Sequence, residues 1–280
     1  MDWLTDPFAY DFMQRSLLAA LLAVLTTSVV GTWVVLRGLS FMGDALAHGV
    51  VPGVAIAFLL DVNLILGAAA AALVMIGAIS LIHRTADLSE DTAIGLLFVG
   101  MLALGVVVIS RSGSFAVDLV GILFGDVLGT TVGDVVVQGI AAVVALGGVV
   151  LFYRPLLVLA FNEEKAEVLG LNPRLTHVVM MGLITLAVVT SFQTVGTLLV
   201  FGLLVAPPAT ASLVASRVPM MMLTAALAGG LSVVAGLIVS FHLDTAAGAT
   251  ISGLAVVLFF LTLSGKTVAR RLALKRPSPV

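Results

Sequence analysis

The sequence predicts an all-α integral membrane protein, a polytopic bundle of about nine spanning helices with short half-helices at its outer face. Two observations carry this prediction. Of the 280 residues, 61% are hydrophobic and only 10% are charged, whereas soluble domains carry about 25% charged residues. The apolar residues also form stretches of the length, about 20 residues, that a helix needs to cross roughly 30 Å of hydrocarbon.

The apolar stretches are separated by short polar or Gly- and Pro-containing breaks, and no linker divides the chain. Residues 1–280 are therefore expected to form a single transmembrane domain. The chain has no cysteine, which excludes disulfides and thiolate metal sites. No basic patch lies outside the C-terminal tail, so nothing indicates a nucleic-acid partner. The expected spans are residues 16–36, 41–60, 64–82, 92–110, 134–152, 176–192, 196–214, 220–241 and 248–264.

Basic residues predict the orientation of this bundle. Nine spans place the two termini on opposite sides, and the tail at residues 265–280 is strongly basic, so we expect the tail in the cytoplasm. Eleven of the 13 Lys and Arg residues then fall on the cytoplasmic side, with Arg15 and Arg111 as the exceptions. Five of the eleven belong to the tail itself, and the other loops agree by six to two. The N-terminus is accordingly expected outside.

Residues 113–133, "GSFAVDLVGILFGDVLGTTVG", are too polar for a regular span and too apolar for a loop. Gly121, Gly125, Gly129 and Gly133 recur every four residues, which on a helix gives a stripe that another backbone can approach closely. Short or re-entrant helices at the outer face fit this pattern, because irregular backbone at membrane depth requires cover by protein or water. Ordinary helix packing is the simpler interpretation of the same stripe.

Asp44 and His48 stand out in the second span, within "SFMGDALAHGVVPG". At positions i and i+4 they share one helix face, with Cβ atoms about 5–6 Å apart. A charged side chain in the membrane costs at least ~2.5–3.5 kcal/mol, so such residues usually face the bundle interior and serve a function. A carboxylate and an imidazole together suit a metal such as Zn²⁺ or Mn²⁺. Pro52 lacks the N–H that would bond the His48 carbonyl, which makes this oxygen a further candidate ligand.

Two interpretations of this pair are open at the level of sequence. Asp44 lies near the start of the span and could cap the helix N-terminus, with His48 hydrogen-bonded to it. As metal ligands, two side chains are too few for a tight site, because Zn²⁺ normally takes four. Two copies of the chain that meet at a symmetry axis would supply two Asp and two His residues. A partly open site of this kind suits transport, because the ion must also leave.

The other histidines are weaker candidates. His83 and His177 are expected at cytoplasmic helix ends, where a solvated interface residue is the simpler interpretation. His242 lies near Asp244 in the last outer loop, where a surface metal contact is a less favoured alternative. In the seventh span, Pro207 and Pro208 predict either a bend or a static kink.

The loop at residues 159–174 is the longest polar stretch expected on the cytoplasmic side. Its residues 163–169 can form a short helix. Asn162 is a suitable N-cap, Glu163 and Glu164 favour the positive helix N-terminus, and Gly170 is a suitable C-cap. Without further information this is an amphipathic loop.

Five segments in order resemble a known family, the membrane-spanning permease of bacterial zinc/manganese-type metal-ion ABC importers. They are "RGLSFMGDALAHGVVPGVAIAF", "DLVGILFGDVLG", "FNEEKAEVLGLNP", "QTVGTLLVFGLLVAPPATA" and "LDTAAGATI". The resemblance extends from about residue 12 to residue 264, and the first, third and fourth segments are specific in combination. One departure is Ala246, where the family pattern leads us to expect proline, and this affects only the shape of the last outer loop.

The resemblance implies a permease similar in architecture to the vitamin B12-type importer, acting as a homodimer in the bacterial cytoplasmic membrane. It implies two P-loop ATPase subunits on the cytoplasmic side and an extracytoplasmic metal-binding protein that delivers the ion. It assigns Asp44 and His48 to the path of Zn²⁺ or Mn²⁺, with no covalently bound cofactor. The loop with Glu163, Glu164, Ala166 and Gly170 is similar to the coupling helix that docks on the ATPase.

The chain itself is not expected to be an enzyme. "SGKT" at 264–267 matches the end of a P-loop, but Phe260 stands where the motif requires glycine. An intramembrane metalloenzyme would need a third ligand and a catalytic water, and no H-E-x-x-H motif occurs. The main alternative is a proton-coupled secondary metal transporter, which predicts uptake without an ATPase and more intramembrane carboxylates than the single clear one here.

Overall fold

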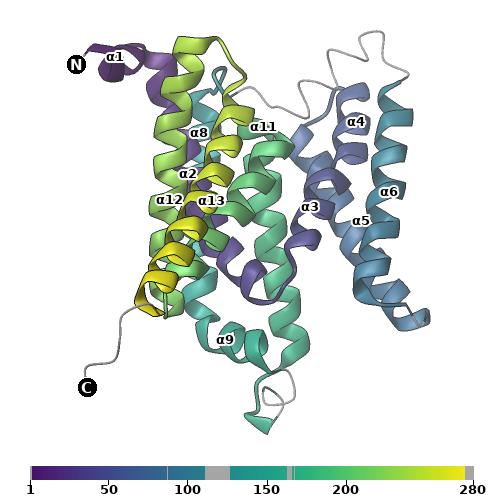
Figure 1. Ribbon diagram of the computed structural model, residues 1–280. Helices are drawn as coiled ribbons and strands as arrows, with labels where there is room; N and C mark the ends of the chain where they lie inside the picture. Colours follow the sequence, from purple (N-terminus) through teal and green to yellow (C-terminus); the bar gives the residue numbers. More distant parts are fainter. Residues whose placement is uncertain (1, 87, 111–126, 163–165, 167, 275–280) are drawn as a thin grey trace, which may run out of the picture.

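The computed structural model describes residues 2–86, 88–110, 127–162, 166 and 168–274, and over these residues it consists of helices and turns without a strand. Figure 1 shows a helical bundle with α1 (Asp2–Thr5) at its upper end and the C-terminal end of α13 (Ala247–Leu274) at its lower end. The all-α prediction is thus confirmed, and the two termini of the described chain lie at opposite ends of the bundle.

Eight helical segments among the described residues are long and apolar enough to cross a membrane. One of them is formed by two consecutive helices, α3 and α4. Three short elements of the described chain lie outside this set: α1 and η1 (Asp6–Ala9) before the first long helix, and α9 (Tyr153–Phe161) at the lower end. The remaining elements are α2 (Asp11–Leu36), α3 (Ser40–Gly49), α4 (Val51–Leu59), α5 (Leu64–Thr85), α6 (Glu90–Ile109), α8 (Val132–Leu151), α11 (Pro173–Val214) and α12 (Val218–Leu243).

The polar breaks of the sequence supply helix caps. The Asn63 side chain accepts hydrogen bonds from the first turn of α5, and Ser89 and Asn172 do the same for α6 and α11. Thr131 and Asp134 form a reciprocal capping box at the start of α8. These side chains satisfy amide groups that a helix N-terminus leaves without intrahelical partners, so each break both ends one span and starts the next.

The long helix α11 reverses direction at Gly196 and therefore crosses the bundle twice. Gly196 has φ 74° and ψ 163°, a conformation open essentially to glycine alone. On the first arm, the Thr190 carbonyl accepts a hydrogen bond from Gln138, near the upper start of α8. On the second arm, Leu213 at the end of Leu199–Val214 accepts one from Lys266, near the lower end of α13. The expected nine crossings are thus all present in the described part of the chain.

The predicted bend at Pro207 and Pro208 is not where α11 is interrupted. Within this helix the non-helical backbone is at Gly196, and both prolines keep helical φ and ψ. Their missing amide donors are tolerated, and Pro207 and Pro208 instead lie close to Gly229 of α12 and Gly31 of α2. The prolines therefore mark packing positions for the neighbouring helices.

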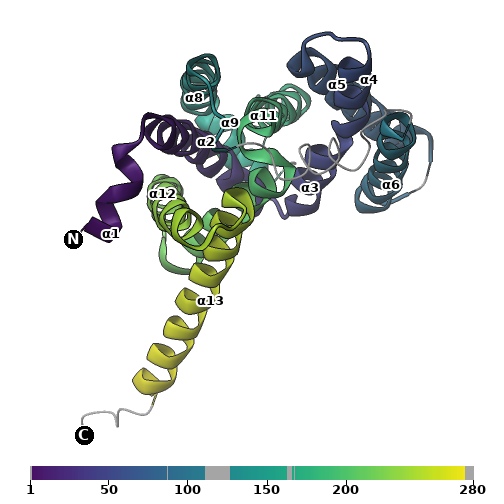
Figure 2. The same cartoon turned by 90° about the horizontal axis from the view of Figure 1, so that it is seen from above.

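Helix α2 lies at the centre of one half of the bundle, with α8, α11 and α12 around it, while α4, α5 and α6 form a second group (Figure 2). Close backbone contacts join the elements of each half. A side chain at Gly31 would meet the backbone of Leu204 in α11, and one at Gly53 of α4 would lie 2.8 Å from the carbonyl carbon of Gly67 in α5. Such approaches are possible only with glycine. Helix α3 lies between the two groups, because it contacts both α11 and α6.

The glycine stripe at 113–133 is only partly described, because Gly121 and Gly125 lie outside the described residues. Over the remainder the expectation of one continuous helical stripe is wrong. Gly129 lies in a turn, Thr131 is in an extended conformation, and Gly133 is the second residue of α8. The capping box at Thr131 starts a new helix between the two glycines, so they do not share a helix face.

Candidate functional site

Helix α3 carries the one acidic and one imidazole side chain of the second span. It begins at Ser40 after Leu39, which makes no side-chain capping bond. Asp44 is therefore the fifth residue of the helix, beyond the first turn, and the structure excludes the alternative that this carboxylate caps the helix. The helix is interrupted at Val50, between α3 and α4. Pro52, near the start of α4, has no amide N–H to donate to the preceding turn.

Asp44 and His48 contact one another, as their spacing predicts. His48 Nε2 lies 3.5 Å from Asp44 Oδ1, and the two side chains are 20% and 22% exposed. The neighbouring Ala45, Leu46 and Ala47 are completely buried. The pair therefore lies on a partly open face of α3, whereas Ala45, Leu46 and Ala47 on its other faces are enclosed by neighbouring helices.

The neighbouring helices hold the imidazole ring in place. The rings of His48 and Phe98 of α6 meet edge to face, with their centroids 5.6 Å apart. Gly43 lies against the Leu204 side chain of α11, and Gly49 lies against the sulfur of Met75 in α5. His48 Nδ1 is buried, with no hydrogen-bond partner among the described residues. Position and orientation of the pair are thus fixed by three other helices, while its hydrogen-bonding capacity is only partly used.

The geometry of the pair suits a shared divalent cation. Two ligands that are each about 2.1 Å from one ion lie roughly 3.4 Å apart in a tetrahedral arrangement, close to the 3.5 Å between Nε2 and Oδ1. Carboxylate and neutral imidazole are both good ligands for Mn²⁺, Fe²⁺ and Zn²⁺. Within the described part of the chain, no third His, Asp or Glu joins them in a metal-sized group. The described part of a single chain thus offers two candidate ligands, fewer than a tight metal site needs.

The predicted coupling loop is described only in part. Glu163 and Glu164 lie outside the described residues. Ala166 is buried, and Gly170 has φ 70°, with the Leu171 amide donating to the Ala166 carbonyl at 2.9 Å. This i to i−5 bond across a left-handed glycine is a Schellman motif, which confirms Gly170 as a helix C-cap.

The remaining histidines do not join the pair. The His83 side chain lies outside the described residues, and His177 lines a groove between α5 and α11. His242 stacks on Trp3 with ring centroids 4.4 Å apart, and its Nε2 lies 2.8 Å from the Trp3 carbonyl oxygen. This contact holds the N-terminal helix against the end of α12. It also engages the imidazole of His242, which the sequence analysis considered as a less favoured surface metal ligand.

Comparison with known proteins decides the family. The model of the ABC 3 transport family matches residues 9–266. The chain belongs to this family. It is therefore a multi-pass permease, the non-catalytic membrane subunit of an ABC transporter. Consistent with that role, the "SGKT" sequence lies inside the continuous helix α13, and Lys266 binds the Leu213 carbonyl.

Individual relatives of this ABC 3 family member are similar over nearly its whole length. The manganese transport system membrane protein MntC of Halalkalibacterium halodurans is 39% identical over 254 residues, 90% of this chain and 87% of the relative. A probable iron transport system membrane protein of Haemophilus influenzae is 32% identical over 263 residues, 94% and 97% of the two chains. The solved structure of PsaBC from Streptococcus pneumoniae in complex with a Fab has a TM-score of 0.85 and 32% identity, covering 93% and 94%.

Sequence reasoning missed two clusters that the fold creates. One is the contact of Trp3 with His242, which are 239 residues apart. The other is the set of basic side chains, two arginines and one histidine, that the fold brings to one end of the groove between α5 and α11: Arg37, Arg174 and His177. The sequence signal common to this second set is that all three residues flank expected cytoplasmic helix ends.

Proposed function

We propose that this chain is the membrane-spanning subunit of an ATP-driven importer that moves a divalent transition metal ion, Mn²⁺ or Zn²⁺, into the cytoplasm. In this proposal the chain works as a homodimer in the bacterial cytoplasmic membrane, with its N-terminus outside and its basic C-terminal tail inside. Two P-loop ATPase subunits and an extracytoplasmic metal-binding protein complete the transporter. The manganese and iron transport named for its relatives agrees with this class of cargo.

The observation that carries the proposal is the contact of Asp44 with His48, 3.5 Å apart in an apolar span. An isolated ionisable pair at membrane depth is costly, and such residues mark ion pathways. Both side chains keep about one-fifth of their surface exposed, so an ion arriving at this face of α3 meets both ligands. Two copies related by a symmetry axis would present four ligands, the number that Zn²⁺ prefers.

The proposed cycle needs only weak binding at this pair. The acidic residues of the expected outer face raise the local cation concentration. The ion then enters between the two copies and exchanges water for carboxylate and imidazole ligands. Closure of the ATPase dimer moves the coupling loops with Glu163, Glu164, Ala166 and Gly170, and the pathway opens to the cytoplasm. Because two ligands per chain bind loosely, the ion leaves without a large barrier.

A proton-coupled secondary transporter is the alternative. It would use the same Asp44 and His48 as proton acceptors in exchange for metal. The family match argues against it, because ABC transporters take their energy from ATP. The two mechanisms differ in a simple way: the importer requires a stoichiometric ATPase partner, whereas the secondary transporter carries metal in its absence.

The test is uptake of radiolabelled Mn²⁺ and Zn²⁺ into vesicles that contain the permease and its ATPase. We expect Asp44→Asn and His48→Gln each to lower ATP-dependent uptake about tenfold or more, because even outer-shell partners of a metal ligand are typically worth 10- to 100-fold. The ATPase should remain bound in both variants, which separates loss of the ion path from loss of assembly.

Asp61→Asn is the matched control. Asp61 is an exposed carboxylate after α4 with φ 53°, a conformation that asparagine tolerates. Uptake by the Asp61→Asn variant should equal uptake by the parent. Normal ATP-dependent uptake by both variants of the pair would overturn the site assignment. Uptake that persists without ATP or ATPase would overturn the importer in favour of the secondary transporter.

A further inference from the structure

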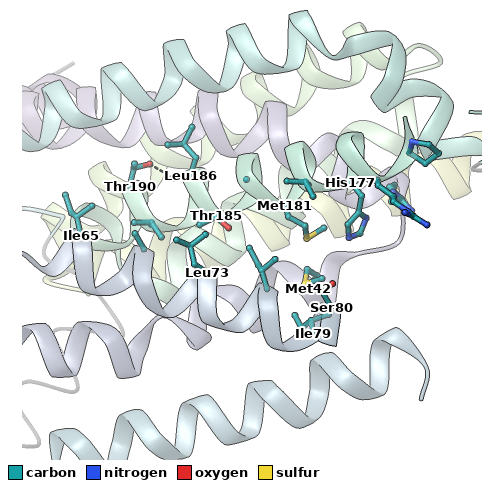
Figure 3. A pocket seen from close by; sticks show the side chains of 18 residues that line it. Met42, Ile65, Leu73, Ile79, Ser80, His177, Met181, Thr185, Leu186 and Thr190 are labelled. Atoms are coloured by element: carbon teal, nitrogen blue, oxygen red, sulfur yellow. Dashed lines mark hydrogen bonds between the residues drawn. The ribbon is translucent and has the colours of Figure 1, made fainter. Parts of the chain in front are cut away.

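A groove of about 760 Å³ lies between α5 and the first arm of α11, away from the acid–imidazole pair. Figure 3 shows it running lengthwise between the two helices. His177 and Ser80 lie toward its right-hand end in this view, where α11 begins and α5 ends, and Ile65 and Thr190 lie toward its left-hand end. The right-hand end is the lower end of the bundle in Figure 1. The groove is thus parallel to the direction in which the helices cross the membrane.

The body of the groove is apolar. From Ile65 to Ile79 on α5, it extends over 14 residues, roughly 21 Å at 1.5 Å per residue. One leaflet contributes half of the hydrocarbon core, about 15 Å, and the groove is longer than this. Leu73, which lines it, is 67% exposed, so the groove borders an exposed apolar surface of the bundle. Its length and apolar lining fit a hydrocarbon chain. Besides these two isoleucines, the apolar lining includes Ala69, Leu73, Ile76, Met181, Leu186 and Val189.

The lower end of the groove is cationic. Arg37 from the end of α2 and Arg174 from the first turn of α11 both line it, together with His177. Arg37 Nη1 is buried, and the described residues offer it no hydrogen-bond partner. No Asp or Glu is part of the lining, and within the described chain neither arginine forms an ion pair. Among the described residues, the mouth therefore presents two guanidinium groups that no acidic side chain pairs with.

We propose that this groove binds one anionic phospholipid, with an acyl chain in the apolar body and the phosphate at Arg37 and Arg174. A guanidinium group matches phosphate oxygens in a bidentate geometry, and a lipid phosphate supplies the partner that buried Arg37 Nη1 lacks. A free phosphate would leave the apolar body unfilled. The lipid would bridge α2, α5 and α11, three helices that belong to both halves of the bundle.

Native mass spectrometry of the purified full-length chain in mild detergent tests the proposal, with phosphatidylglycerol and phosphatidylethanolamine of the same acyl chains as probes. We expect the parent to retain phosphatidylglycerol preferentially, and inorganic phosphate not to displace it. Arg37→Gln and Arg174→Gln should each lower the affinity for phosphatidylglycerol roughly fivefold, which corresponds to about 1 kcal/mol per basic residue near anionic lipid. Arg37→Lys and Arg174→Lys should keep the preference.

A second variant blocks the body of the groove and leaves the arginines in place. Gly182 lines the groove, and a Cβ atom added there meets no neighbouring atom within 4 Å. Gly182→Leu should therefore fold normally and lower the retention of both lipids. The matched controls are Gly77→Leu, on α5 in equally open space but outside the lining, and Arg271→Gln on the exposed end of α13. Both should bind lipid as the parent does.

Equal retention of the two lipids by the parent would overturn the proposal. So would an unchanged preference in the Arg37→Gln and Arg174→Gln variants, or displacement of the lipid by inorganic phosphate. If Gly182→Leu changed the oligomeric state while lipid retention stayed the same, a second copy of the chain and not a lipid would cover the groove.

Discussion

Gly53 of α4 lies so close to α5 that its replacement by alanine should destabilise the bundle. An alanine Cβ at this position would be 2.7 Å from the Ala71 Cβ and 2.8 Å from the Gly67 carbonyl carbon, against an ordinary contact of at least 3.4 Å. The two helices would have to separate by at least about 0.6 Å, because both obstacles are fixed to the α5 backbone and cannot move as a flexible side chain would. Overpacking of this kind costs typically 1–3 kcal/mol, so we expect a loss of about 2 kcal/mol.

Gly77→Ala is the comparison that isolates this effect. Gly77 is also in α5, but no atom lies within 4 Å of its added Cβ. The substitution should be neutral or stabilising by up to about 1 kcal/mol, because alanine is the better helix former. The measurement is the free energy of unfolding of the purified chain in mixed detergent micelles, followed by circular dichroism. If Gly53→Ala were as stable as Gly77→Ala, the close approach of α4 and α5 would be refuted.

Two further predictions concern the ends of the bundle. Thr131→Ala removes the hydroxyl that bonds Asp134 Oδ2 at 2.7 Å and should destabilise the start of α8 by about 1 kcal/mol, seen as faster amide exchange there, whereas Thr131→Ser should retain protection. Trp3→Ala removes the ring stacked on His242 and should increase exchange and proteolysis in residues 2–9 while leaving α12 protected. Trp3→Phe should restore most of the protection, and a wild-type pattern in Trp3→Ala would show that the stacking does not hold the N-terminal helix.

The number and order of the spans could be predicted from the sequence because hydropathy depends directly on local composition. The exact bounds could not. Helix α13 continues to Leu274 and α2 begins at Asp11, whereas the apolar stretches end at residue 264 and begin at residue 16. A helix ends where its last amide and carbonyl groups find caps, and not where the hydrocarbon ends. Gly196, where α11 reverses, is the first residue of the expected span 196–214, and not part of the break before it. This reversal without a loop depends on a backbone conformation that composition does not specify.

The acid–imidazole pair could be predicted because both residues lie on one helix, where spacing determines proximity. Its surroundings could not, since Phe98 and Leu204 come from helices far away in the sequence. The groove shows the same limit. Arg37 and Arg174 are distant in the chain, and only the packing of α2 against α11 places both at the mouth. Contacts between helices depend on which faces meet, and a single sequence does not state this.

The tight reversal of α11 has a mechanical consequence. Its first arm starts directly after the loop at residues 159–172, and its second arm places Leu204 against Gly43, next to Asp44. Gly196 alone interrupts the helical backbone between them, so there is no slack segment to absorb a displacement of the first arm. We therefore expect a tilt of the first arm to displace the second arm as well. The position of the Asp44 carboxylate is therefore expected to depend on the tilt of the first arm of α11.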